Sequence, residues 1–147
     1  MAAAWWLGGH STVYAPICPC RCGWDPVGRD PLNGNRPLNF TEQLNQTFSY
    51  LVQLRATEYL LEHHAEAAPF VLSLGPISGH DIVSSNGQVV AEVFAAVTPD
   101  NNDKLDKDVA KVATSEAQHK YVFYFCPGHP KGMKDRGGVK IISLVQI

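Results

Sequence analysis

The stretch GHDIVSSNGQVVAEVF, residues 79–94, contains the strongest local signal for the fold. Its dipeptide Asn86-Gly87 is typical of a two-residue type I′ hairpin turn, because both central residues of that turn need a positive φ. Apolar residues flank the dipeptide on both sides, as in paired strands. The stretch therefore predicts an antiparallel hairpin whose two strands are covered on both faces.

Counting outward from this turn predicts which residues lie opposite each other. Ile82 faces Ala91, and one step further Asp81 faces Glu92. Directly opposed side chains share a face, with Cβ atoms roughly 5 Å apart, where like charges destabilise a sheet. Burial adds to the penalty, so the pair predicts either a shared proton or a bound divalent cation such as Mg²⁺. The alternative is that this end of the hairpin is solvated and both acids point to water.

Hydrophobic periodicity predicts the elements that surround the hairpin. A helix begins with a capping box at Asn39 and Glu42 and runs to about His63. A second helix turns Leu105, Val109 and Val112 towards the core. The predicted elements are a helix, three strands, a helix and two strands, beginning near residues 39, 69, 80, 88, 98, 120 and 139. The glycine-rich segment 128–138 is predicted to be a basic loop, and the whole pattern is that of an α/β protein.

Residues 1–37 differ from the rest of the chain in composition. They are rich in Gly, Pro and Asn, and neither helical nor strand periodicity persists in them. We expect an irregular arm there, followed by one domain at residues 38–147. The segment CPCRC holds Cys18, Cys20 and Cys22, whose alternating spacing differs from the cysteine pairs of ordinary structural zinc sites. Reduced thiols are therefore favoured, and a zinc-stabilised interaction module is a further hypothesis.

Charge and hydropathy exclude some classes of partner. The 147 residues have a formal net charge of −2, so any binding of nucleic acid depends on a local patch rather than on an overall basic field. No apolar run approaches the roughly 20 residues of a membrane-spanning helix. The first residues, MAAAWWLGGH, lack the basic segment of a secretion signal. We expect a cytoplasmic protein without a membrane partner.

The order of elements, with Asp81 on the second strand and Glu92 on the third, resembles the PD-(D/E)XK fold of restriction endonuclease-like nucleases. The resemblance covers about residues 38–147. It implies an αβββαβ core, with a central mixed sheet flanked by helices, and a metal-dependent endonuclease acting on DNA. It also implies Mg²⁺ (or Mn²⁺) bound by Asp81 and Glu92, with Glu42 and the backbone carbonyl of Val93 as further ligands.

One residue departs from the pattern of that family. Phe94 stands where the motif has a lysine, which in the family steadies the attacking water and the charge that grows on the phosphate. Lys104, on the first turn of the second helix, is the expected replacement and joins the two acids in the implied catalytic set. It forms one stripe with Lys107 and Lys111 at helical spacing. The alternative is an ordinary solvated stripe of lysines.

Further basic residues are predicted to contact DNA phosphates. They are Lys107 on the second helix and Lys131, Lys134 and Arg136 in the segment 128–138. A plain surface turn is the alternative for that segment. His80 is predicted, from the alternation of the hairpin, to point to the face opposite the two acids.

Two functional hypotheses follow from these observations. The first is the Mg²⁺-dependent endonuclease, and because members of the family often cut duplexes as dimers, a homodimer is also expected. The second is a catalytically silent member of the same fold that binds nucleic acid or a protein. Phe94 favours the second hypothesis, because loss of the motif lysine would silence the site.

Overall fold

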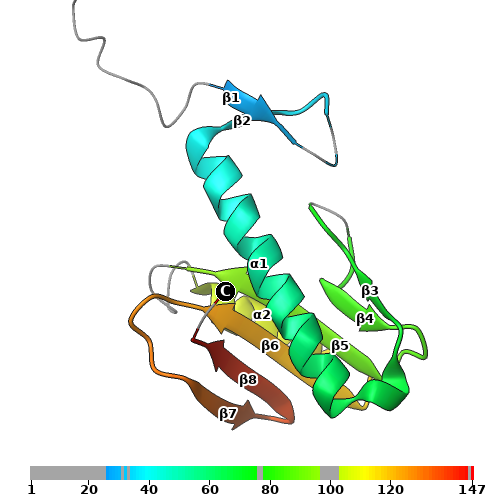
Figure 1. The fold of residues 1–147 in the computed structure, drawn as a ribbon. Coiled ribbons are helices and arrows are strands. Elements are labelled where there is room, and N and C mark those ends of the chain that lie inside the picture. Colours follow the sequence, from blue (N-terminus) through cyan, green and yellow to red (C-terminus); the bar gives the residue numbers. More distant parts are fainter. Residues whose placement is uncertain (1–25, 31, 33, 76–77, 97–102, 146) are drawn as a thin grey trace, which may run out of the picture.

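A six-stranded mixed sheet with a helix on each face forms the body of the protein (Figure 1). The computed structural model describes residues 26–30, 32, 34–75, 78–96, 103–145 and 147. In spatial order the strands are β3 (Phe70–Leu72), β4 (Ile82–Ser84), β5 (Val89–Ala95), β6 (His119–Phe125), β8 (Val139–Leu144) and β7 (Gly132–Arg136). The α/β class predicted from the sequence is confirmed.

The sheet combines two kinds of connection. Strands β3, β4 and β5 are antiparallel neighbours, whereas β5 and β6 are parallel. Helix α2 (Lys104–Ala113) lies between β5 and β6 in the sequence, as a parallel pair requires a crossover. Strand β8 is parallel to β6 and antiparallel to β7. The prediction that residues 128–138 form only a loop is wrong, because β7 lies within them.

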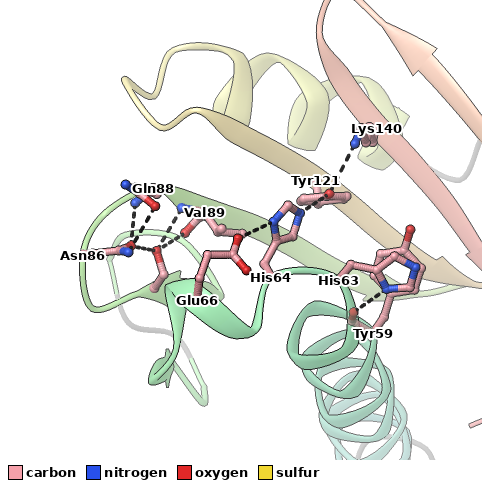
Figure 2. Close-up of polar contacts among 10 residues, drawn as sticks. Tyr59, His63, His64, Glu66, Asn86, Gln88, Val89, Tyr121 and Lys140 are labelled. Carbon is pink, nitrogen blue, oxygen red and sulfur yellow. Dashed lines mark hydrogen bonds and ion pairs between the residues drawn. The ribbon is translucent and has the colours of Figure 1, made fainter.

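The β4–β5 hairpin has the predicted register but a different turn. Ile82 pairs with Ala91, as predicted. The predicted type I′ turn is wrong, because Asp103 is the only non-glycine residue with positive φ in the described part of the chain. Instead, a backbone bond from Gly87 to Ser84 closes the loop, and the Asn86 side chain accepts from the Gln88 N–H at 3.0 Å (Figure 2). The four-residue loop preserves the register.

Helix α1 (Phe40–His63) crosses one face of the sheet, and its N-terminal half reaches beyond the sheet (Figure 1). The capping box is confirmed: Asn39 and Glu42 each accept a bond from the other's backbone N–H, at 2.8 and 3.0 Å. Val52, Ala56 and Leu60 pack on the sheet. Neither this helix nor any other among the described residues is long and apolar enough to cross a membrane.

The segment predicted to be an irregular arm is partly regular. Strands β1 (Pro26–Arg29) and β2 (Pro37–Asn39) form an antiparallel ribbon at the start of α1. The prediction of an irregular segment is therefore wrong for these residues. Residues 1–25, including the CPCRC segment, lie outside the described residues.

Strand β5 is buried on both faces, as predicted. Val89, Ala91 and Val93 belong to the core beneath α1, while Val90 and Phe94 belong to the core beneath α2. Alternation places Glu92 on the α2 side. The buried side of α2 includes Val109 and Val112, with Leu105 partly buried beside them, so its predicted inner face is confirmed.

Candidate functional site

Asp81 stands one residue before β4 and is fixed from two directions. Its Oδ2 accepts a hydrogen bond from the backbone N–H of Val93 at 2.8 Å. The buried Gln53 of α1 donates from Nε2 to the backbone oxygens of Asp81 and Ser73, at 2.6 and 3.2 Å. Among the described residues, Oδ1 of Asp81 has no hydrogen-bond partner. One oxygen of a well-fixed carboxylate is therefore open.

Glu92 is a buried carboxylate in the middle of β5, with 2% of its surface exposed. Its Oε1 accepts a hydrogen bond from His80 Nδ1 at 2.7 Å, and its Oε2 accepts one from Lys111 Nζ at 2.8 Å. Burial raises the pKa of Glu92, and the charge of Asp81 raises it further, while the bonds from Lys111 and His80 act in the opposite direction. Asp81 and Glu92 are thus close enough to influence each other electrostatically.

The prediction for His80 is wrong, because its ring contacts Glu92 instead of pointing to the other face of the sheet. Strand β4 begins only at Ile82, so the alternation of the hairpin does not extend to residue 80. Gly79, with φ of +115°, redirects the chain immediately before it. His80 is therefore part of the acid network.

The three lysines of the predicted stripe have different surroundings: Lys104 and Lys107 line the same cavity as Asp81, whereas Lys111 contacts Glu92. The ring of Phe94 stacks on Tyr124 with centroids 5.6 Å apart, and Lys104 Nζ lies 5.9 Å from the centroid of the Phe94 ring. Lys111 is bound to Glu92. Sequence reasoning proposed Lys104 as the replacement for the motif lysine and did not assign Lys111 a role. Helical spacing placed Lys111 in the stripe but gave no signal for its contact with Glu92.

Asp108 is a third acid in the same neighbourhood, missed by the sequence analysis. It is 3% exposed, and its Oδ1 accepts from Lys104 Nζ at 2.5 Å, while its Oδ2 is buried and has no hydrogen-bond partner in the part of the chain that the structure describes. Burial raises its pKa, Lys104 lowers it, and the charge of Asp81 raises it. Its position between Leu105 and Val112 on the apolar side of α2 was the signal for its burial.

A cleft of about 700 Å³ opens between the N-terminal half of α1, the end of the β4–β5 hairpin and the first turns of α2. Its polar lining includes amides, acids and cations, among them Asn45, Gln46, Gln53, Asp81, Lys104 and Lys107. An oxygen anion in this cleft would meet ammonium groups and amide N–H donors. The composition of the lining therefore suits a phosphate-bearing ligand.

Glu42 and Val93 also line this cleft. Glu42 completes the helix cap with Asn39 and lies 3.7 Å from Arg36 Nη1. The described part of the chain contains no group of three or more His, Cys, Asp or Glu side chains that could hold a metal ion together. A cation beside Asp81 would thus take one or two carboxylates and water, which is a common mode for Mg²⁺.

The other predicted DNA contacts lie apart from the cleft. Lys134 and Arg136 are on β7, at the edge of the sheet that lies four strands from β4, and Lys131 directly precedes this strand. Arg136 forms an ion pair with Asp106 of α2. Only Lys107, of the four basic residues, lines the cleft.

A second polar network lies on the α1 side of the sheet (Figure 2). Lys140 Nζ donates to the Tyr121 hydroxyl at 3.5 Å, and this hydroxyl donates to His64 Nε2 at 2.6 Å. His64 Nδ1 then donates to Glu66 at 3.3 Å. Burial raises the pKa of Tyr121, and burial followed by the charges of His64 and Lys140 lowers the pKa of His119. This network fastens the end of α1 to β6 and β8.

The chain was compared with known protein families, proteins and structures. Neither the protein-family models, nor the curated proteins, nor the solved structures gave a match to the chain.

Proposed function

We propose that this protein is a metal-dependent endonuclease that hydrolyses phosphodiester bonds in DNA, with a restriction endonuclease-like αβββαβ core. The order α1-β3-β4-β5-α2-β6, with a parallel β5–β6 pair, supports the core. The observation that carries the activity is the open Oδ1 of Asp81, in a cleft that also contains Lys104 and Lys107.

The residues of the cleft fit Mg²⁺ or Mn²⁺ through oxygen donors. Asp81 would hold the ion with water, and Glu42 and the Val93 carbonyl are the further oxygen donors in the same cleft. Glu92 contributes its charge, because both of its oxygens already accept hydrogen bonds. When bound, the metal ion lowers the pKa of a coordinated water and neutralises charge on the scissile phosphate.

The lysines supply the positive charge that Phe94 cannot. Lys104 Nζ lies 5.9 Å from the centroid of the Phe94 ring, and Phe94 is the residue that stands in place of the motif lysine. Its ammonium group stabilises the negative charge that develops on the phosphate, and Lys107 binds the neighbouring phosphate oxygens. The hydrogen bond from Lys111 opposes the rise that burial causes in the pKa of Glu92.

The substitution Asp81→Asn tests this proposal. Asparagine can still accept the bond from the Val93 N–H, so the hairpin is preserved while the charge is lost. We expect cleavage of a panel of labelled DNA substrates in Mg²⁺ or Mn²⁺ to fall at least about 100-fold. Asp106→Asn is the matched control, since Asp106 is exposed and forms its ion pair with Arg136 outside the cleft. Equal cleavage by wild type and Asp81→Asn would refute the nuclease assignment.

The second candidate is a catalytically silent DNA-binding module of the same fold. Two observations favour it: Phe94 replaces the motif lysine, and both oxygens of Glu92 are occupied by His80 and Lys111. Calorimetric titration with Mg²⁺ and Mn²⁺ separates the two candidates. The nuclease binds the ion in wild type and loses this affinity in Asp81→Asn, whereas the silent module binds DNA without measurable affinity for either ion.

A further inference from the structure

An apolar groove of about 220 Å³ lies beside the cleft, between the N-terminal half of α1 and the ends of β5 and β6. Leu44 and Phe48 of α1 form one wall, and Phe125 and Pro127 form part of the other. Leu44 and Phe48 expose 41% and 42% of their surface, although they face other apolar residues across this groove. The groove therefore offers an aromatic and aliphatic surface to a ligand.

The groove and the cleft adjoin each other. Asn45, Ala95 and Ala96 line both of them. On the cleft side of this boundary lie Lys104 and Lys107. A ligand that occupies both parts must combine a flat apolar group with an anionic group a short distance away. A nucleotide has this combination in its base and its phosphate.

We propose that the groove binds an unpaired nucleobase of the strand whose phosphate lies in the cleft, so that the preferred ligand is single-stranded or locally unpaired nucleic acid. This inference rests on the proposed function, since it takes nucleic acid as the ligand. A base within a duplex is stacked between its neighbours and cannot enter a lateral groove without being extruded. An unpaired base can stack on the ring of Phe48 or Phe125, and such stacking tolerates any base sequence.

Asn45 gives the groove a polar boundary. Its side chain is exposed at the junction with the cleft, where its amide can donate to and accept from the edge of a base. The apolar wall therefore holds the base by its face, and the amide contacts its edge. The lysines of the cleft hold the phosphate of the same nucleotide.

The experiment compares binding of labelled oligonucleotides by fluorescence anisotropy in EDTA, so that no cleavage interferes. Wild type should bind a single strand more tightly than the duplex of the same sequence. Phe48→Ala should weaken single-strand binding about tenfold and leave duplex binding unchanged. Wild type and Phe48→Ala should bind an oligonucleotide of abasic sites with equal affinity, because that ligand has no base to enter the groove. Leu44→Asn provides a second test of the same wall, with folding of each variant checked by thermal unfolding.

Phe40→Ala is the matched control, because Phe40 is an exposed aromatic residue of α1 outside the groove. Unchanged single-strand affinity in folded Phe48→Ala and Leu44→Asn overturns the inference while leaving the nuclease proposal intact. Wild type that binds no nucleic acid overturns both. A shift from dimer to monomer in Phe48→Ala, seen by sedimentation without a change in affinity, assigns the groove to a second copy of the chain and also overturns the inference.

Discussion

Two polar networks lie on opposite faces of the same sheet, and they satisfy their buried groups in different ways. In the network around Tyr121 and His64, each donor meets an acceptor and the series ends at an exposed carboxylate. In the network around Asp81, Glu92 and Asp108, acceptors exceed donors among the described residues, because one buried oxygen of Asp108 has no partner there. The excess of acceptors, together with the adjoining cleft, distinguishes a site that can take up external positive charge from one that only holds the fold together.

The largest expected effect on stability is that of Lys111→Ala. This change leaves Glu92 buried with His80 as its remaining hydrogen-bond donor, and it should lower the free energy of unfolding by about 2 kcal/mol. The value is reduced from that of a fully buried pair because the Lys111 side chain is 44% exposed. Urea unfolding at about pH 7.5 and about pH 5 should give a smaller loss at the lower pH, where Glu92 can accept a proton.

Lys134→Ala is the control for this measurement, since Lys134 is an exposed lysine on β7. It should change stability by less than about 0.5 kcal/mol. A loss for Lys111→Ala that is the same at both pH values would show that the ion pair with Glu92 does not cause it.

A smaller effect is expected in the other network from Tyr121→Phe. The change removes the donor to His64 Nε2 within the core and should lower the free energy of unfolding by about 1 kcal/mol. The affinity for Mn²⁺, measured by calorimetry, should not change. Tyr59→Phe is the matched control, because the Tyr59 hydroxyl makes no hydrogen bond within the described residues. A change in Mn²⁺ affinity for Tyr121→Phe would mean that the two faces are not independent.

The smallest effect is expected in the pH dependence of stability. Folding raises the pKa of Glu92 above its ordinary value of 4.5, so this group binds a proton more readily in the folded than in the unfolded state. The stability that this group contributes is complete below pH 4.5 and is lost as the pH rises through the raised pKa. The melting temperature of the wild type should therefore fall as the pH rises through this range. Glu92→Gln should make this fall less steep without abolishing it, because burial also raises the pKa of Asp108. If the melting temperature of Glu92→Gln fell as steeply as that of wild type, Glu92 would not be a cause of the pH dependence.

The features that were predicted correctly depend on local chemistry. The register of β4 and β5 follows from apolar alternation around Asn86-Gly87, and the start of α1 follows from the reciprocal bonds of Asn39 and Glu42. The position of His80 could not be predicted in this way, because Gly79 interrupts the alternation before β4.

The contacts that tertiary packing creates were also beyond the sequence. Lys111 reaches Glu92 only because α2 packs across β5, and spacing along the helix does not say which of its lysines lies over that residue. Strand β7 was missed because all five of its residues are exposed, so it has no hydrophobic alternation to detect. Burial, the strongest signal in a sequence, is absent from such a strand.

The charged character of β7 has a consequence for behaviour at high concentration. An edge strand with unpaired backbone groups is a template on which strands of other molecules can add. In β7, Lys134, Asp135 and Arg136 occupy successive exposed positions, so another strand would have to desolvate charges to pair there. This edge therefore opposes the growth of intermolecular sheets and favours solubility over fibrous aggregation.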